Sequence, residues 1–289
     1  MKVMITGATG LLGRSIKKEM EKDNEIISLG FSREADDIIK LDLTDFDLVR
    51  ILIMTEKPDI IIHSAAERRP DVTDNNPDAA EELNVAATEN IAKLAAKYNV
   101  FMVYISTDYV FDGTSSPYNT EAKANPINLY GKTKFLGEQV TKEHADNYAI
   151  LRVPILYGNQ ENLKESAATA IMEQILENPE MKVDNWAARF PTYVGDVAFT
   201  LRELIEKVDI KNCQEVFHWS GDEEFTKFSM AKVMGDILDI DVSKIESNNE
   251  PTAGAPRPKN CQLDCSKIEN MGIGRRTPLA DVIENYLIG

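Results

Sequence analysis

Residues 6–14 read Thr6-Gly7-Ala8-Thr9-Gly10-Leu11-Leu12-Gly13-Arg14 and follow directly after a short apolar segment, Lys2–Thr6. The glycines form the pattern G-x-x-G-x-x-G between a predicted strand and a predicted helix, Leu11–Lys22. In a βαβ unit such glycines permit a tight turn, close approach of the backbone to a pyrophosphate, and close packing of helix on strand. Free N–H groups at the start of the helix attract a phosphate. The sequence therefore predicts a dinucleotide-binding loop formed by Gly7, Thr9, Gly10, Leu11, Leu12 and Gly13.

The segments after this loop alternate between apolar strands and helices. Asp59–Ser64 is a continuous apolar run, which is typical of a strand covered on both faces. Strands that alternate with helices indicate βαβ units, so the predicted class is α/β, a doubly wound Rossmann fold with a parallel sheet. Its further strands are predicted at Glu25–Leu29, Val100–Thr107 and Ala149–Val153, and its further helices at Asp45–Lys57, Pro77–Tyr98 and Asn128–Lys142.

The pattern becomes less regular after Pro154. Helices are predicted at Ser166–Glu177, Val194–Lys207 and Lys227–Leu238, with a strand at Glu215–Trp219. We expect a Rossmann domain over residues 1–153 and a smaller mixed lobe over residues 154–289. The two are predicted to be interleaved, because elements within residues 190–220 are expected to complete the main sheet.

Composition excludes several functional classes. The 289 residues carry a formal net charge of −16, which argues against nucleic-acid binding. Apolar runs stay far below the roughly 20 residues that span a bilayer, and the sequence enters a strand pattern at Met1 without a secretory leader. The three cysteines suit neither a disulfide framework nor a metal site, so we expect a reduced, cytoplasmic protein without a metal.

The end of the second strand indicates which cofactor is bound. NAD-binding proteins place an acidic residue there for the ribose 2′-hydroxyl, whereas an arginine accommodates the 2′-phosphate of NADP. This chain reads Phe31-Ser32-Arg33 at that position, and its next acidic residue is Glu34. The prediction is NADP, bound by Phe31, Ser32 and Arg33 with help from Arg14. The alternative is that Arg33 is a solvated surface charge.

Tyr130 and Lys134 stand four residues apart on a predicted helix and therefore share one face. A lysine so placed lowers the pKa of the tyrosine and holds the nicotinamide ribose, while the tyrosine donates a proton to a carbonyl. Thr107 ends a predicted strand and would bond the same carbonyl oxygen. Arg68 follows another strand end, where open α/β sheets bind ligands, and is a further candidate for contact with the cofactor or the substrate. His63 lies inside an apolar strand and is predicted to be a hydrogen-bonded core residue.

Together these motifs resemble the extended short-chain dehydrogenase/reductases. Further matching stretches are His63-Ser64-Ala65-Ala66 and Ser106-Thr107-Asp108. The resemblance implies that Asp42 and Leu43 hold the adenine, that Ser64 and Ala65 line the cofactor, and that Leu156 lies beside the nicotinamide.

Two families within this group resemble the chain more closely. Residues 106–113 (Ser-Thr-Asp-Tyr-Val-Phe-Asp-Gly) are similar to dTDP-4-dehydrorhamnose reductases. Longer stretches resemble regulatory beta subunits of methionine adenosyltransferase, notably residues 66–72, 189–192, 217–221 and 257–267. Ile155 stands where the reductases usually have tryptophan, which puts their nucleotide-sugar pocket in doubt. The sequence ends at Gly289 without the basic, aromatic tail of such beta subunits, so we expect a less secure hold on the catalytic subunit.

Three functional hypotheses remain open at this point. The first is a cofactor-bound regulatory subunit that binds a methionine adenosyltransferase catalytic subunit and modulates S-adenosylmethionine synthesis. The second is an NADPH-dependent reductase of a 4-keto nucleotide sugar, which would use Thr107, Tyr130 and Lys134. The third is an NADP(H) sensor without turnover.

Overall fold

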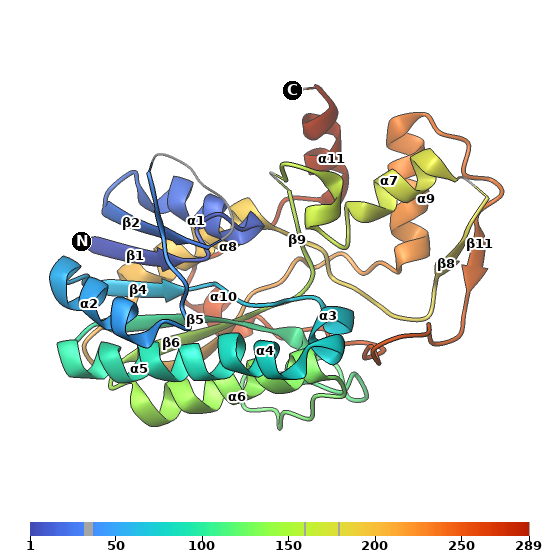
Figure 1. Cartoon of the computed structure of the whole chain (residues 1–289). Coiled ribbons are helices and arrows are strands. Elements are labelled where there is room, and N and C mark those ends of the chain that lie inside the picture. Colours follow the sequence, from blue (N-terminus) through green and yellow to red (C-terminus); the bar gives the residue numbers. More distant parts are fainter. Residues whose placement is uncertain (32–36, 159, 179, 289) are drawn as a thin grey trace.

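The computed structural model describes residues 1–31, 37–158, 160–178 and 180–288. A parallel sheet forms the centre of the larger lobe (Figure 1). Its seven strands are β1 (Lys2–Thr6), β2 (Glu25–Gly30), β3 (Ile38–Lys40), β4 (Ile60–His63), β5 (Phe101–Thr107), β6 (Tyr148–Val153) and β10 (Gln214–His218). They lie in the order β10-β6-β5-β4-β1-β2-β3. The strand order reverses between β1 and β4, and ligands bind beside the carboxyl ends of the strands at such a reversal.

Helices cover both faces of the sheet (Figure 1). On one face Ile16 and Leu201 belong to the same buried cluster as Val3, Ile60 and Val103 of the sheet. The helices of this face are α1 (Leu11–Met20), α8 (Val194–Lys207) and α10 (Ser266–Asn270). The other face carries α2 (Phe46–Glu56), α5 (Ala87–Tyr98) and α6 (Leu129–His144). Because both faces are covered, the central strands β4, β5 and β6 are buried along their whole length and are mainly apolar rather than alternating.

Short helices lie at the carboxyl edge of the sheet. They are α3 (Pro70–Asn75) and α4 (Pro77–Glu81). A π-helical turn, Glu82–Ala86, joins α4 to α5, and 3₁₀ turns cover Asp108–Val110 and Leu163–Glu165. The π-helical turn buries Asn84, whose side chain accepts from Glu67 N (2.9 Å) and donates to Thr133 Oγ1 (3.1 Å). Asn84 thus fixes the loop after β4 against α6.

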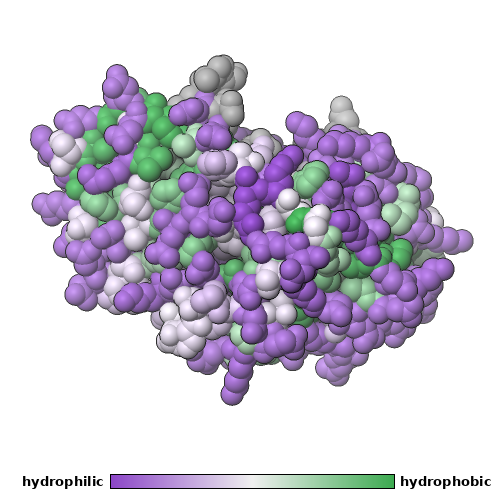
Figure 2. Space-filling view, turned by 180° about the vertical axis from the view of Figure 1, so that it is seen from behind, coloured by the Kyte–Doolittle hydropathy of each residue, from purple (hydrophilic) through white to green (hydrophobic). Residues whose placement is uncertain are grey.

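The smaller lobe has a hydrophobic core of its own, on the right in Figure 1. It includes Met172, Met230 and Ile283. The helices are α7 (Ala170–Glu177), α9 (Lys227–Leu238) and α11 (Leu279–Ile288), and the two-stranded sheets are β8 (Lys182–Asp184) with β11 (Glu246–Asn248) and β7 (Leu156–Tyr157) with β9 (Thr192–Tyr193). Figure 2 shows the molecule from behind, with a mainly hydrophilic surface and separate hydrophobic patches.

The predicted fold class is confirmed: the chain is α/β with a doubly wound parallel sheet. One predicted helix, Pro77–Tyr98, is interrupted by the π-helical turn, and another begins at Ala170 rather than Ser166. The domain boundary at Val153 stays a prediction. Within the described ranges no helix is both long enough and apolar enough to span a membrane.

Candidate functional site

A cavity of about 700 Å³ opens at the carboxyl ends of β1, β4 and β5. Its far wall comes from the smaller lobe, which contributes Leu156, Glu165, Arg189 and Lys227. Arg14 is described but does not line this cavity. The cavity brings together the other predicted site residues that the structure describes: Gly7, Thr9, Gly10, Leu11, Leu12, Gly13, Phe31, Asp42, Leu43, Ser64, Ala65, Arg68, Thr107, Tyr130, Lys134 and Leu156. Ser32 and Arg33 lie outside the described residues.

The glycine-rich loop leaves its backbone open to the cavity. Gly7 has a φ of +68°, and a Cβ on it would lie 2.9 Å from the backbone of Ala65. A Cβ on Gly13 would lie 2.1 Å from the Gly7 carbonyl oxygen, so α1 packs directly on the loop. No side chain caps the helix at Gly10, and its first turn has no acidic residue. Uncapped amides at a helix N-terminus fit a pyrophosphate.

The adenine end of the cavity is formed by residues after β2 and β3. Asp42 accepts hydrogen bonds through Oδ1 from the amide (2.9 Å) and the hydroxyl (2.7 Å) of Thr44. Among the described residues no group donates to its Oδ2, so this oxygen could accept from an exocyclic amine of a base. Phe31 lines the same end with 62% of its surface exposed, which leaves its ring accessible to a planar ligand.

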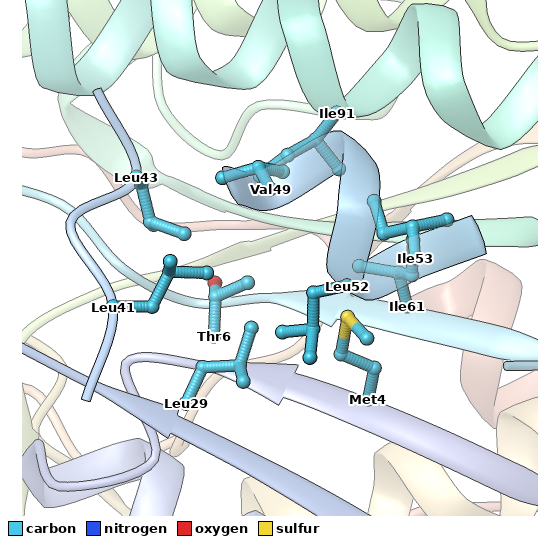
Figure 3. A pocket seen from close by; sticks show the side chains of 10 residues that line it. All are labelled: Met4, Thr6, Leu29, Leu41, Leu43, Val49, Leu52, Ile53, Ile61 and Ile91. Carbon is cyan, nitrogen blue, oxygen red and sulfur yellow. The ribbon is translucent and has the colours of Figure 1, made fainter. Parts of the chain in front are cut away.

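The floor below the adenine end is closed by apolar packing. Figure 3 shows the side chains that converge there, with Leu41 and Leu43 facing Val49 of α2 and Leu29 of β2. The void between them measures about 10 Å³, too small for a cofactor. The packing buries the side chains of Leu41 and Leu43, while Asp42 between them stays exposed at the cavity.

Thr107, Tyr130 and Lys134 meet at the centre of the cavity. Asn128 caps α6 by accepting from the Gly131 amide (2.8 Å), and the helix then presents Tyr130 and Lys134 on one face. A hydrogen bond links the side chains of Tyr130 and Thr107. The Thr107 hydroxyl donates its proton to Asp108 Oδ1 (3.1 Å). The Lys134 ammonium lies 4.0 Å above the ring of Tyr104.

Burial determines the protonation of Tyr130 and Lys134. Burial raises the pKa of Tyr130, and the hydrogen bond between Tyr130 and Thr107 only partly opposes this rise. The net shift is upward because desolvation of the phenolate is the largest effect, and the lowering of this pKa predicted from Lys134 stays a prediction. Burial lowers the pKa of Lys134 to about 7, against the attraction of Glu138. At neutral pH Tyr130 therefore keeps its phenolic proton, and Lys134, on the same helix, is partly charged.

His63 is a hydrogen-bonded core residue, as predicted. Its Nδ1 lies 2.7 Å from Thr6 Oγ1 and its Nε2 lies 2.9 Å from Thr88 Oγ1. Because Thr88 donates its own proton to the Asn84 carbonyl, Nε2 of His63 carries the hydrogen and Nδ1 accepts from Thr6. Burial lowers the pKa of His63 to about 3, so the ring is neutral and takes no part in the cavity.

Sequence reasoning missed the cationic end of the cavity. Arg189, Lys227 and Arg257 line it beyond Tyr130, together with Asp108 and Tyr109. Burial raises the pKa of Asp108 to about 7. Arg189 and Arg257 lie in two of the stretches that carry the family resemblance (residues 189–192 and 257–267). The sequence around each residue does not predict that the two line the same cavity.

Glu165 is a second residue that the sequence did not single out. It accepts hydrogen bonds from Arg14 Nη1 (3.1 Å) and Nη2 (2.7 Å), and its carbonyl accepts from Arg68. Arg14 also donates to the Thr9 carbonyl (2.7 Å). The role predicted for Arg14 at a 2′-phosphate stays a prediction, and its guanidinium here joins the two lobes across the glycine-rich loop. Among the described residues no cluster of three or more metal-ligating side chains occurs.

Comparisons with known proteins agree with this geometry. Residues 1–287 match the family model described as RmlD substrate binding domain. The methionine adenosyltransferase 2 subunit beta of Bos taurus is 46% identical over 290 residues, which cover 99% of this chain and 87% of the bovine protein. The dTDP-4-dehydrorhamnose reductase of Aggregatibacter actinomycetemcomitans is 30% identical over 283 residues, which cover 93% of this chain and 92% of that reductase.

A solved structure extends the comparison to three dimensions. A dTDP-4-dehydrorhamnose reductase from Bacillus anthracis, crystallised in complex with NADP, superposes with a TM-score of 0.85 at 28% identity, covering 99% of this chain and 97% of that one. Sequence, fold and cavity therefore lead to one assignment: the chain belongs to the RmlD substrate-binding-domain family of extended short-chain dehydrogenase/reductases, and within it is like the beta subunit of methionine adenosyltransferase 2.

Proposed function

We propose that this chain is an NADP-binding regulatory subunit that associates with the catalytic subunit of a methionine adenosyltransferase and modulates S-adenosylmethionine synthesis. The observation that carries the proposal is the identity of 46% with a beta subunit along 99% of the chain. The reductase from Aggregatibacter reaches 30% over a similar share. The higher sequence identity with the beta subunit favours the regulatory role over the reductase role.

The cofactor assignment is supported by the form of the cavity. The uncapped start of α1 offers amides to a pyrophosphate, and Asp42 keeps one carboxylate oxygen for the adenine. Tyr130 and Lys134 reach the centre of the cavity, where they would hold the nicotinamide ribose. When bound, NADP would supply a hydride donor or acceptor at that point.

The test is association of the full chain with the catalytic subunit from the same source, measured by size-exclusion chromatography at micromolar concentrations with and without NADP. We expect co-elution and a changed rate of S-adenosylmethionine formation. Separate elution together with an unchanged rate would overturn the regulatory assignment. Binding of NADP, measured alone by calorimetry, tests the cofactor assignment independently of the partner.

A reductase is the second candidate, and the arrangement of Thr107, Tyr130 and Lys134 favours it. Tyr130 is a neutral phenol with a hydrogen bond to Thr107, and a general acid must hold its proton in this way. Consumption of NADPH in the presence of 4-keto nucleotide sugars tests this candidate. We expect Tyr130→Phe to lower such a rate about 100-fold or more, whereas Tyr98→Phe, on α5 outside the cavity, serves as the control. A rate that Tyr130→Phe leaves unchanged excludes reduction at this site.

The third hypothesis, an NADP(H) sensor, would remain if the chain binds NADP tightly but neither consumes NADPH nor associates with the catalytic subunit.

A further inference from the structure

Helix α2 is apolar on its outer side as well as on the side that packs on the sheet. Val49 and Ile53, which are 2% and 1% exposed, point from α2 into the packed floor below the adenine end (Figure 3). Leu48, Ile51 and Met54 lie on the outer side and are 50%, 45% and 44% exposed. A helix at the surface of a globular protein normally turns polar side chains outward, and one that is apolar all round is buried. The outer side of α2 therefore has the composition of a covered surface.

Exposed apolar side chains are concentrated in and beside this helix. Among the described residues nine large apolar side chains are exposed, and five of them lie within residues 39–54: Ile39, Phe46, Leu48, Ile51 and Met54. Leu48, Ile51 and Met54 follow one another at intervals of three, so they form one continuous strip along the helix. Single apolar residues on a surface are ordinary, whereas a contiguous group marks an interaction site. We call Asp47, Leu48, Arg50, Ile51 and Met54 the outer face of α2.

The two charged residues of the outer face make it complementary to itself. Asp47 and Arg50 have side chains that are 85% and 43% exposed, and they pair with each other at 3.1 Å. A dimer with a two-fold axis brings the same surface of both copies together, so that each residue meets its counterpart's neighbour in a reciprocal way. A face that carries one acid and one base beside an apolar strip meets this requirement, because the acid of each copy can pair with the base of the other.

The local charge also favours contact between two copies. The chain carries a net charge of −16, but residues 38–57 contain four acidic and three basic side chains. Two copies that meet at a strongly acidic part of their surfaces repel each other, whereas this segment adds little repulsion. A basic partner would gain more by binding to the acidic remainder of the surface. The outer face of α2 therefore suits a second copy of this chain better than a strongly charged partner.

We propose that the outer face of α2 is the contact surface of a homodimer, in which the α2 helices of two copies pack antiparallel about a two-fold axis. Leu48 and Ile51 of both copies form the apolar centre, and Asp47 of each copy pairs with Arg50 of the other. Five side chains from one helix cover less than the roughly 800 Å² that each partner contributes to a stable interface, so we expect a weak dimer that dissociates at micromolar concentrations. No residue of the outer face lines the cavity, and the proposal does not rest on the proposed function.

Sedimentation velocity of the full chain over a range of micromolar concentrations tests the dimer. We expect the sedimenting mass to rise with concentration from the 32.4 kDa of one chain toward twice that value. Ile51→Glu places a charge in the apolar centre and should weaken the dimer about tenfold or more. Ile127→Glu is the matched control, because Ile127 is a similarly exposed isoleucine (38%) outside α2. The mass of one chain at every concentration, or equal dissociation constants for the two variants, would overturn the proposal.

An exchange of charges tests the antiparallel packing. Asp47→Arg alone and Arg50→Asp alone each bring like charges together across the interface, so each variant should dimerise about tenfold or more weakly than the wild type. A mixture of the two variants restores both pairs of opposite charges and should form mixed dimers, while circular dichroism checks that each variant is folded. A mixture that dimerises no better than its components contradicts the antiparallel arrangement. If the chain stays monomeric and Ile51→Glu abolishes its association with the catalytic subunit, the face belongs to that partner and the homodimer is refuted.

Discussion

Arg14 and Glu165, which are 151 residues apart, are joined by two hydrogen bonds of 3.1 and 2.7 Å. Arg14 lies on the first turn of α1, and Glu165 ends a 3₁₀ turn of the smaller lobe. The pair therefore connects the two walls of the cavity directly beside the glycine-rich loop. Because Glu165 is 6% exposed, its charge depends on this partner far more than a surface carboxylate does.

We predict that Glu165→Gln lowers the free energy of unfolding by about 1–3 kcal/mol and speeds the release of NADP, because it removes a charged acceptor that ties the lobes together. Urea unfolding and stopped-flow displacement of NADP measure the two effects. The control is Asp47→Asn, which breaks an exposed pair with Arg50 and should cost less than about 1 kcal/mol. Unchanged stability and unchanged release would contradict a role for the pair in holding the lobes.

A second ion pair lies in the core below the site. Arg152 on β6 and Glu138 on α6 are 3% and 0% exposed, with Nη2 and Oε2 2.7 Å apart. Glu138 also accepts from Ser106 Oγ (2.6 Å). We predict that Arg152→Met destabilises the chain by about 3–5 kcal/mol, since it leaves a buried carboxylate without its cation. Lys93→Met, in an exposed pair with Glu89, should change stability by less than about 1 kcal/mol in the same urea titration. Similar losses in both variants would refute this reading of the buried pair.

The pH dependence of stability is predicted from His63. Its pKa is lowered by burial to about 3 in the folded chain, against 6.5 for the ordinary group. Between these values the unfolded chain binds a proton that the folded chain does not, so stability falls as the pH falls from about 6.5 toward 3. We predict that His63→Gln reduces the slope of unfolding free energy against pH by about 1 kcal/mol per pH unit between pH 5 and 6.

The control for this prediction keeps the imidazole and changes its neighbour. Thr88→Val removes the hydrogen bond to Nε2, so it should lower stability at every pH while leaving the slope near that of the wild type. A slope that His63→Gln does not alter would show that the ring is not neutral in the folded chain at these pH values.

The parts of the site that lie within one stretch of sequence could be predicted from local patterns. The glycine-rich loop, and the spacing of Tyr130 and Lys134, are readable because each lies within one element and its flanks. β3 was missed because Ile38–Lys40 is a short, partly exposed edge strand. α3 was missed because Pro70–Asn75 has no apolar repeat, although Pro70 at its start is a signal that a helix begins.

The cationic end of the cavity, formed by Arg189, Lys227 and Arg257, shows why the rest of the site could not be predicted. Arg189, Lys227 and Arg257 belong to three segments that are joined by the backbone bridge between Arg189 and Phe225 and by one hydrogen bond from the Ala188 amide to the Lys259 carbonyl. Each residue alone has the appearance of an ordinary surface charge. Glu165 is similar, since only the folded chain places it against Arg14. Tertiary contacts of this kind leave no periodicity in the sequence.

The preference for NADP over NAD depends on the segment after β2, where Arg33 lies outside the described residues. If Arg33 pairs with the 2′-phosphate, Arg33→Ala should weaken NADP about tenfold to a hundredfold and leave NAD unchanged, because only NADP carries that group. Calorimetric titration with each cofactor measures the ratio, and thermal shifts give a rapid first comparison, since a ligand of the folded state raises stability by mass action. Arg50→Ala, on α2 and away from the cavity lining, is the control. Equal loss for both cofactors would mean that Arg33 supports the loop rather than the phosphate. A wild-type chain that binds NAD more tightly than NADP would remove the argument for NADP altogether.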